Sequence, residues 1–390
     1  MELRHPESDS DWDQTFEVLR RAFNLTVERE RWQPNQPAEM LWQLYDGAQL
    51  LATSRNNDWG QWFGGRRVRT AAIAGVAVAP QHRGRGYASE LFRRTLLAWR
   101  DQGFAQSGLM PATTGLYRGV GYEVSAVWSD RTIATRALRD LPRASHVQVR
   151  VATVEDLPKM RECMQRVTRT RDGWLDMADQ WWSWWSTTYD EGFGFAAVHG
   201  DDVLGYVWYR HVPDPAWGFG ISTEGVVADD VDVYCALWQT LASSSSMVHS
   251  LKVRNLPPEN PLLLMLPEQD LVPGLELRYM SRLLDVPSAV AARGYPAGLD
   301  VTVDVAVEDP IIDANAGRWR LQVRDGVGSA EPGGDGAIEL DVGALSSIFT
   351  GWATPETMRL AGRLRGGGDD DVAALRAMFA GPTPSLQLFF

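Results

Sequence analysis

Two arginines and two glycines stand together at residues 81–86, QHRGRG, between an apolar run and a helical pattern. A turn of this kind presents several backbone N–H groups and the positive end of a helix dipole at one point. Gly84 and Gly86 let the backbone approach a ligand closely, while Arg83 and Arg85 add charge-assisted contacts. The segment predicts a phosphate-binding turn, and a basic surface turn without a ligand is the alternative.

The end of the chain carries a second candidate group. Residues 384–390, PSLQLFF, are largely apolar, where most chain ends are polar and frayed. We expect this tail to be buried, together with the α-carboxylate of Phe390. Desolvation would raise the pKa of that carboxylate and make it a better base. A tail that simply packs against the C-terminal domain is the alternative.

The turn must be held by a strand and a helix. Residues 70–80 are predicted to form a buried strand, and residues 88–103 an amphipathic helix closed by Gly103. A second short strand at 107–112, then a turn and a third strand, complete a crossover unit with a parallel pair. Upstream, Trp12, Phe16, Leu19 and Phe23 have helical spacing, with Asp9 or Ser10 as N-cap, and predict a helix facing the core.

The pattern restarts near residue 148. Another short strand and capped helix follow, with Leu157, Met160 and Met164 on one helix face. Two strands around the turn at 200–202 come next, and then a strand, a loop and a helix at 221–244. In this copy DDVDVY (229–234) stands where QHRGRGY stood. The second copy has therefore lost the glycine turn.

A third region begins near residue 286. Alternating patterns predict strands at 301–309, 318–326 and 337–342, with a turn-rich loop at 326–336 and a capped helix at 369–382. We therefore expect three domains, at residues 1–147, 148–285 and 286–390.

Composition narrows the function. The formal net charge of -12 disfavours nucleic-acid partners and favours cationic small molecules. Cys163 and Cys235 lack metal-ligand spacing, as do the six histidines, so neither disulfides nor a metal are expected. No apolar leader or membrane span is apparent, and we expect a cytoplasmic protein.

The segments QHRGRGYA and LYRGVGY (116–122) resemble the cofactor loop and a later segment of the GCN5-related N-acetyltransferases (GNAT superfamily). The whole chain resembles the enhanced intracellular survival (Eis) type, through these motifs and through YCALW (234–238), DVPSAVAARGY (285–295) and the terminal phenylalanine. The resemblance implies a fold of two tandem GNAT-like mixed-sheet domains, the second degenerate, followed by an α+β domain like sterol carrier proteins.

The same resemblance assigns roles to residues. Acetyl-CoA would be bound by the turn at Arg83–Gly86 and by main-chain groups of Val76 and Val78, which are also ordinary strand core. Tyr117 would act as general acid toward the departing thiolate and the carboxylate of Phe390 as general base. One wall of the acceptor cavity would be formed by Phe23 and Trp32, with Glu28 and Phe389 as weaker candidates. Packing alone is the alternative for Tyr117, and a solvated carboxylate for Glu28.

We expect an acetyl-CoA-dependent N-acetyltransferase that acts on a primary amine of a small molecule or of a lysine side chain. Phe389 is not acidic and no carboxylate directly follows Phe23; both features weaken the case for an aminoglycoside or polyamine and leave an aromatic amine open. A non-catalytic acyl-CoA sensor and a lipid carrier are the alternatives. Trp181, Trp182, Trp184 and Trp185 are predicted to pack in the core or to line the acceptor pocket. The family resemblance also suggests a homo-oligomer, with a hexamer as one arrangement.

Overall fold

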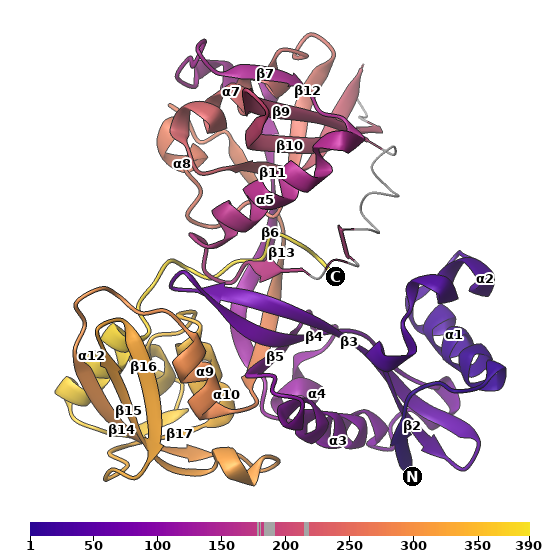
Figure 1. Cartoon of the computed structure of the whole chain (residues 1–390), viewed down its shortest axis with the longest axis vertical. Coiled ribbons are helices and arrows are strands. Elements are labelled where there is room, and N and C mark those ends of the chain that lie inside the picture. Colours follow the sequence, from indigo (N-terminus) through magenta and orange to yellow (C-terminus); the bar gives the residue numbers. More distant parts are fainter. Residues whose placement is uncertain (178, 180, 183–191, 214–217) are drawn as a thin grey trace. The chain divides into compact units, whose positions relative to one another are not determined.

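The computed structural model describes residues 1–177, 179, 181–182, 192–213 and 218–390 (Figure 1). The chain divides into two units. The first contains Met1–Ser125, Tyr279–Gly381 and Phe390, and the second contains Ala126–Arg278 and Pro382–Phe389. The chain passes from the first unit to the second within strand β6 (Glu123–Ala134) and returns within β13 (Leu271–Leu283).

The N-terminal part of the first unit is a mixed sheet with helices. In spatial order its strands are β1 (Glu2–Arg4), β2 (Leu41–Asp46), β3 (Gln49–Phe63), β4 (Arg66–Val78), β5 (Gln106–Leu109) and the end of β13. Neighbours are antiparallel except β4 and β5, which are parallel. This confirms the predicted crossover, because helix α3 (Tyr87–Asp101) connects the two parallel strands.

Helix α3 covers one face of the sheet with the side chains that its 3.6-residue period places together. Its buried residues are Leu91, Phe92, Thr95, Leu96 and Trp99. Phe92, Leu96 and Trp99 share one core cluster with Ile73 of β4. Full burial of an aliphatic or phenyl side chain contributes about 1.5–3 kcal/mol, so this cluster fixes β4 against α3.

Helix α1 (Asp9–Phe23) forms where the sequence predicts a helix, but its cap and its buried face differ from the prediction. The N-cap is Ser8, in a capping box with Asp11, rather than Asp9 or Ser10. The buried positions are Asp11, Thr15, Val18 and Leu19. Phe23, the last residue of the helix, is 49% exposed. Beyond it lie α2 (Arg29–Trp32) and the short 3-10 helices η1 (Gln33–Asn35) and η2 (Ala38–Met40).

The C-terminal part of the first unit contains a second sheet. Its strands, in spatial order, are β16 (Val327–Pro332), β15 (Gly317–Arg324), β14 (Val301–Glu308), β17 (Ile338–Asp341) and β18 (Leu364–Gly366). The helices packed with them are α9 (Val286–Ala292), α10 (Val342–Phe349), α11 (Pro355–Leu360) and α12 (Asp369–Met378). The predicted loop at 326–336 is wrong over β16, because Asp325 and Gly326, both with positive φ, form a tight hairpin turn that pairs β16 with β15.

The second unit repeats the architecture of the first sheet. Its strands in spatial order are β6, β12 (Val248–Arg254), β11 (Phe219–Ala228), β10 (Asp202–Pro213), β9 (Phe193–His199) and β7 (Gln148–Val151). Its other elements are η4 (Thr135–Asp140), η5 (Val154–Asp156), α5 (Leu157–Thr168), β8 (Leu175–Asp176), α7 (Val231–Ala242) and α8 (Leu262–Met265). The only parallel pair among the described pairings of this sheet is β11 with β12, on either side of α7. This is the predicted internal repeat.

The tail leaves the C-terminal sheet and packs on the second unit. Ser385 pairs with Val127 of β6, and the Gln387 side chain bonds the backbone of Leu175 in both directions. Leu386 is fully buried, as expected, whereas Phe389 is 46% exposed. Residues 382–389 therefore do not follow the simpler expectation of packing against the C-terminal domain.

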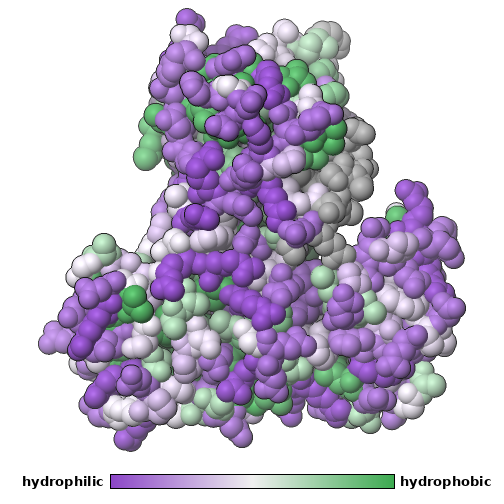
Figure 2. All heavy atoms as spheres, viewed as in Figure 1, coloured by the Kyte–Doolittle hydropathy of each residue, from purple (hydrophilic) through white to green (hydrophobic). Residues whose placement is uncertain are grey.

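Hydrophilic residues dominate the face shown in Figure 2, with apolar residues scattered among them. Among the residues that the structure describes, no helix has the length and apolar character needed to cross a membrane.

Candidate active site

Strand β4 leaves its parallel neighbour part-way along its length. The pairs between β4 and β5 run from Thr70 with Gln106 to Ile73 with Leu109, and β4 continues to Val78. On the other side the register to β3 shifts between Ala74 and Ala77, which leaves Gly75, at φ +59°, and Val76 as a bulge. The edge of β4 beyond Ile73 therefore offers backbone groups to a ligand rather than to β5.

The glycine turn lies directly beyond this edge. After η3 (Pro80–His82), Gly84 has φ +75° and Gly86, the N-cap of α3, has φ +81°. No side chain caps the helix, and the first intrahelical bond is donated by Glu90 N to Gly86 O. The preceding N–H groups have no acceptor within the helix. With exposed Arg83 and Arg85 beside them, these N–H groups give the end of a 15-residue helix the donors and charges that suit an anion.

Tyr117 lies in the short helix α4 (Thr114–Arg118), where the sequence predicted a turn. Its ring packs edge-on against Phe92 at 5.4 Å and against Tyr122 at 6.1 Å. Burial raises the pKa of Tyr117 to about 12. Its hydroxyl has no hydrogen-bond partner among the described residues, whereas the hydroxyl of Tyr122 bonds Ser107 Oγ at 2.7 Å. Tyr117 is thus protonated near neutral pH.

The side chains of β5 alternate between two faces of the sheet, and this alternation separates two chemical environments. Ser107 faces α3, because it bonds Tyr122. Gln106 faces the other way, where its amide donates to Thr70 Oγ1 at 2.8 Å and to Gln61 Oε1 at 2.9 Å. Tyr117 belongs to the α3 face, in the core cluster that contains Phe92 and Tyr122.

Phe390 lies on the opposite face. Its ring centroid is 5.0 Å from that of Trp59 and 6.4 Å from that of Tyr279. Trp59 is the cross-strand partner of Thr70, so the two share a face. Tyr279 lies over Gly108, where a Cβ would collide with its hydroxyl. The last residue of the chain therefore reaches the first unit on the face opposite Tyr117.

Helix α1 covers this same face nearer the bulge. The nearest side chains to Gly75 on its Cβ side are Leu19 of α1 and Arg55 of β3. Arg55 shares its face with Asn57 and Trp59, which follow it at two-residue intervals along β3. An acetyl donor bound along α3 and an amine acceptor bound near α1 would thus meet at the edge of β4 from opposite faces of the sheet.

Three family models match the chain: "Acetyltransferase (GNAT) domain" models over residues 3–125 and 173–283, and "Sterol carrier protein domain" over residues 286–387. An uncharacterized N-acetyltransferase of Streptomyces coelicolor is 30% identical over 77% of this chain and 76% of its own length. N-acetyltransferase Eis of Mycobacterium tuberculosis is 28% identical over 82% of this chain and 80% of its own length. The crystal structure of a GCN5-related N-acetyltransferase from Anabaena variabilis superposes with a TM-score of 0.93 at 26% identity over the full length of both chains.

This chain belongs to the GNAT acetyltransferases. The predicted fold is confirmed: two GNAT domains precede a domain of the sterol carrier protein type. The GNAT family uses acetyl-CoA, and the turn at Arg83–Gly86 has the backbone geometry and the charges that a pyrophosphate needs. No cluster of three or more potential metal ligands occurs among the described residues.

The remaining predicted residues fall into three groups. Val76 packs against the core cluster that contains Phe92, and Val78 against the cluster that contains Leu91. Their backbone groups can therefore bind a ligand while their side chains pack in the core. Phe23 and Glu28 are exposed near α2, and Trp32 is half-buried against Trp12 and Phe16. Phe389 belongs to the second unit, where its ring contacts Trp128 at 5.8 Å.

Two of the four tryptophans predicted to pack in the core or to line the acceptor pocket lie among the described residues. Trp181 and Trp182 are half-buried and line a cavity of the second unit. Trp184 and Trp185 lie outside the described residues.

The sequence analysis did not single out Trp59, Tyr279 or Arg55. Trp59 and Tyr279 are some 220 residues apart in sequence, and each contacts Phe390 because the pairing of the sheet brings their strands onto one face. Arg55 is half-buried and donates to Gln36 Oε1 at 2.7 Å, and it forms no ion pair with a described carboxylate. Burial lowers the pKa of its guanidinium. No local pattern marks any of the three.

Proposed function

We propose that this acetyltransferase moves the acetyl group of acetyl-CoA to the primary amine of a small molecule whose body is apolar or aromatic. The observation that carries the proposal is the aromatic setting of Phe390, between Trp59 and Tyr279, on the face opposite Tyr117. Trp59 and Tyr279 are buried and hold the ring of Phe390, which is partly exposed and would contact an acceptor on that face. A lysine side chain, which also carries a primary amine, is the second candidate acceptor.

The charges on the acceptor face support a monoamine rather than a polycation. Arg55 lies on this face, next to the bulge of β4, and has no carboxylate partner among the described residues. A half-buried guanidinium repels further cationic groups. Phe389, which precedes the terminal residue, adds no negative charge. An aminoglycoside or a polyamine would bring several ammonium groups to a face that carries the guanidinium of Arg55 as well as the α-carboxylate of Phe390.

Each residue would have a defined part in the transfer. The N–H groups at the bulge near Val76 would polarise the thioester carbonyl. The amine nitrogen forms a bond to the carbonyl carbon, the bond from carbon to sulfur breaks, and CoA leaves as a thiolate that accepts a hydrogen bond from Tyr117. The proton lost by the attacking nitrogen passes to the α-carboxylate of Phe390 and then to solvent.

The pKa of Tyr117 limits what this residue does. A phenol with a pKa of about 12 and a thiol near 8.5 differ by about 3.5 units, or roughly 5 kcal/mol against complete proton transfer. Tyr117 therefore stabilises the developing thiolate chiefly by hydrogen bonding. Complete transfer of the proton from Tyr117 to the thiolate becomes favourable only if the bound substrates reduce the difference between the two pKa values.

Release of CoA thiol from acetyl-CoA tests the proposal directly. The acceptor panel contains 2-phenylethylamine, a lysine-containing peptide, spermidine and kanamycin, at equal amine concentration. We expect the highest kcat/KM with 2-phenylethylamine and loss of turnover in Tyr117→Phe. Preferential use of kanamycin or spermidine would overturn the acceptor class. Acetyl-CoA binding without release for any amine would favour a non-catalytic sensor instead.

A further inference from the structure

The second GNAT domain contains a cavity of about 430 Å³ that belongs wholly to the second unit. It lies where β11 and β12 separate: their parallel pairs end at Thr223 with Val253, and Glu224–Ala228 continue along one wall. This position corresponds to the edge of β4 in the first domain. The size is that of a site for a small organic molecule.

The cavity is not a second acetyl-CoA site, because the helix that follows β11 caps itself. The side chain of Asp230, the N-cap of α7, accepts from Asp232 N at 2.9 Å and from Val233 N at 3.0 Å. In the first domain the corresponding N-cap is Gly86, which has no side chain. A carboxylate with Asp229 and Asp232 beside it repels a pyrophosphate. The ligand of this cavity is therefore chemically different.

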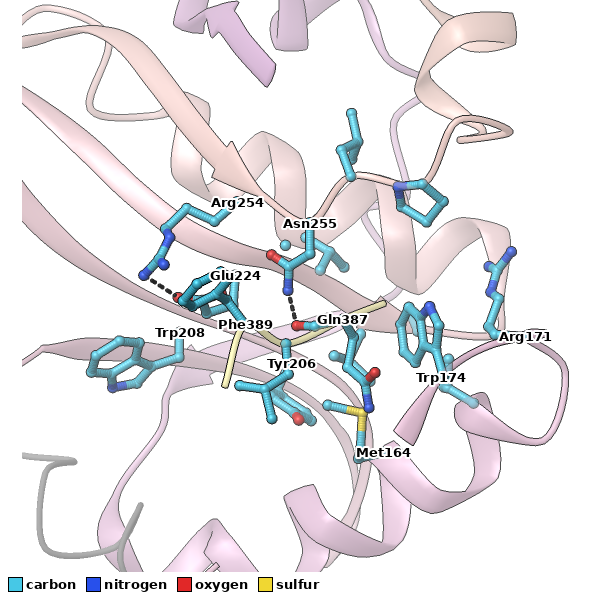
Figure 3. Close-up of a pocket in the computed structure, with 18 of the residues that line it drawn as sticks. Met164, Arg171, Trp174, Tyr206, Trp208, Glu224, Arg254, Asn255, Gln387 and Phe389 are labelled. Carbon is cyan, nitrogen blue, oxygen red and sulfur yellow. Dashed lines mark hydrogen bonds and ion pairs between the residues drawn. The ribbon is translucent and has the colours of Figure 1, made fainter. Parts of the chain in front are cut away.

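Aromatic and apolar side chains form most of the walls (Figure 3). They include Trp174, Tyr206, Trp208, Met164, Val227 and Leu256. In Figure 3, Trp174 and Arg171 lie at one end, Glu224 and Arg254 at the other, and Tyr206 between them. A flat aromatic body fits such walls better than a flexible polar one.

Two buried polar atoms in the walls have no hydrogen-bond partner among the described residues. They are the indole N–H of Trp174, a residue 7% exposed, and Oδ1 of Asn255, a residue 5% exposed. The amide nitrogen of Asn255 donates to the main-chain carbonyl of Gln387 in the tail, which fixes the orientation of its oxygen. Buried polar groups are rarely left without a partner. The cavity thus carries a donor at the Arg171 end and an acceptor in its middle.

The charges of the lining point to an anion. Among the described residues that line the cavity there are three arginines, Arg171, Arg210 and Arg254, and one carboxylate, Glu224, which is 3.0 Å from Arg254. Arg171 is half-buried and forms no ion pair with any described residue. This local positive excess occurs in a chain with a net charge of -12, so average composition does not account for it.

We propose that the second GNAT domain binds a small aromatic carboxylate in this cavity, with the ring among Trp174, Tyr206 and Val227 and the carboxylate at Arg171 and the Trp174 N–H. The site is independent of the acceptor class proposed for the first domain. It gives the degenerate copy a ligand of its own after the loss of the glycine turn. Because Gln387, Leu388 and Phe389 also line the cavity, the bound molecule contacts the tail that ends in Phe390.

Isothermal titration calorimetry of the full chain with three matched probes tests this site. The probes are 2-naphthoate, the neutral 2-naphthamide and the cationic 2-naphthylmethylamine. We expect 2-naphthoate to bind and the amide to bind at least tenfold more weakly. An aromatic amine belongs to the acceptor class proposed for the first domain, so any heat from 2-naphthylmethylamine should be the same in a variant with a blocked cavity. Absence of binding by 2-naphthoate, tighter binding of the amide, or binding of the amine that is lost when the cavity is blocked would overturn the proposal.

Variants then locate the binding. Arg171→Gln should weaken 2-naphthoate about tenfold or more, as for other charge-assisted hydrogen bonds, and Met164→Trp should block the cavity. Arg143→Gln, an exposed arginine of the same unit, should change the Kd less than twofold. Circular dichroism melting establishes that each variant is folded. Unchanged affinity in both folded cavity variants would place the ligand elsewhere and refute the site.

Discussion

The rings of Phe390 and Trp59 meet edge to face, with centroids 5.0 Å apart and planes inclined at 62°. Aromatic pairs in this geometry contribute about 0.5–1.5 kcal/mol beyond the area they bury. The contact fixes the last residue of the chain on the face of the sheet that also carries α1. It is the structural basis for assigning a chemical role to the α-carboxylate of Phe390.

Extending the chain by one glycine after Phe390 should separate the carboxylate from the ring. The ring contacts with Trp59 and Tyr279 remain, whereas the carboxylate moves by one residue, about 3.5 Å. Loss of a general base lowers kcat by about 10²–10⁴-fold, and the KM for acetyl-CoA should stay within about threefold. Steady-state kinetics on the extended chain measure both values.

The matched variant is Phe390→Ala, which keeps the terminal carboxylate and removes the ring. It should lose less activity than the extended chain, because the terminal carboxylate stays at its place in the sequence, although the ring's buried area and its edge-to-face contact of about 0.5–1.5 kcal/mol are lost. If the extended chain turns over at the rate of the parent protein, the carboxylate is not the base and the tail serves only packing.

Ionisation of Tyr117 should not lower kcat/KM at any pH below about 10.5. Burial raises the pKa of this phenol to about 12, so it is protonated throughout the range in which the acceptor amine becomes the free base. The value of kcat/KM should therefore rise with pH up to the pKa of the amine. Tyr117→Phe should lower kcat about 100-fold at every pH without altering the shape of the profile.

Tyr122→Phe is the control for this prediction. Tyr122 is fully buried and its hydroxyl bonds Ser107, so the change should cost about 1 kcal/mol of stability and leave the profile unchanged. A limb that falls near pH 9 and disappears in Tyr117→Phe would show that the phenol ionises in the working range, against the effect of its burial.

The prediction of the fold succeeded where a signal was local. The 3.6-residue period and the glycine turn located α3, and a second copy of the strand and helix pattern located α5 and α7. The cap of α1 at Ser8 is a near miss, because Ser8, Asp9 and Ser10 are all competent caps in sequence. Strand β16 was missed although Asp325 and Gly326 form a typical hairpin signal, because the following glycines were read as a loop.

The sequence predicted the residues of the candidate site that lie in short motifs, but not those that strand pairing brings together. Gly84, Gly86 and Tyr117 lie in short motifs that the chain itself displays. The environment of Phe390 depends on Trp59 and Tyr279, which are brought together by strand pairing across most of the chain. Phe23 was expected to face the core by its spacing, but the buried face of α1 contains Val18 and Leu19, and Phe23, the last residue of the helix, is exposed.

Gly86→Ala should raise the KM for acetyl-CoA more than it lowers kcat. Gly86 has φ +81°, and a left-handed conformation costs a residue with a Cβ roughly 1–2 kcal/mol. A shift of the turn to relieve this strain would disturb the N–H groups that bind phosphate. We expect a KM increase of about tenfold, measured by thiol release at saturating amine.

Gly47→Ala supplies the control, because Gly47 also has positive φ, at +55°, and open space around its Cβ position, yet lies in the turn between β2 and β3. It should carry the same backbone cost and leave the KM unchanged. Equal effects of the two substitutions on the KM would show that Gly86 matters through stability alone.

Arg282→Met should destabilise the first unit strongly. Arg282 and Asp309 are both fully buried, and Nη2 of the guanidinium lies 2.6 and 2.7 Å from the two carboxylate oxygens. This pair connects the end of β13 to the segment after β14. Removing one partner of a buried pair costs about 3–5 kcal/mol, because Asp309 would remain buried without its counter-charge. For a unit of this size the midpoint of thermal unfolding should fall by roughly 6–20 °C.

The control variant Arg320→Met removes the exposed pair with Asp304 and should cost less than about 1 kcal/mol of stability. Circular dichroism measures both midpoints of thermal unfolding. A similar small shift of the midpoint in both variants would mean that water or a shifted backbone solvates Asp309 when the arginine is removed.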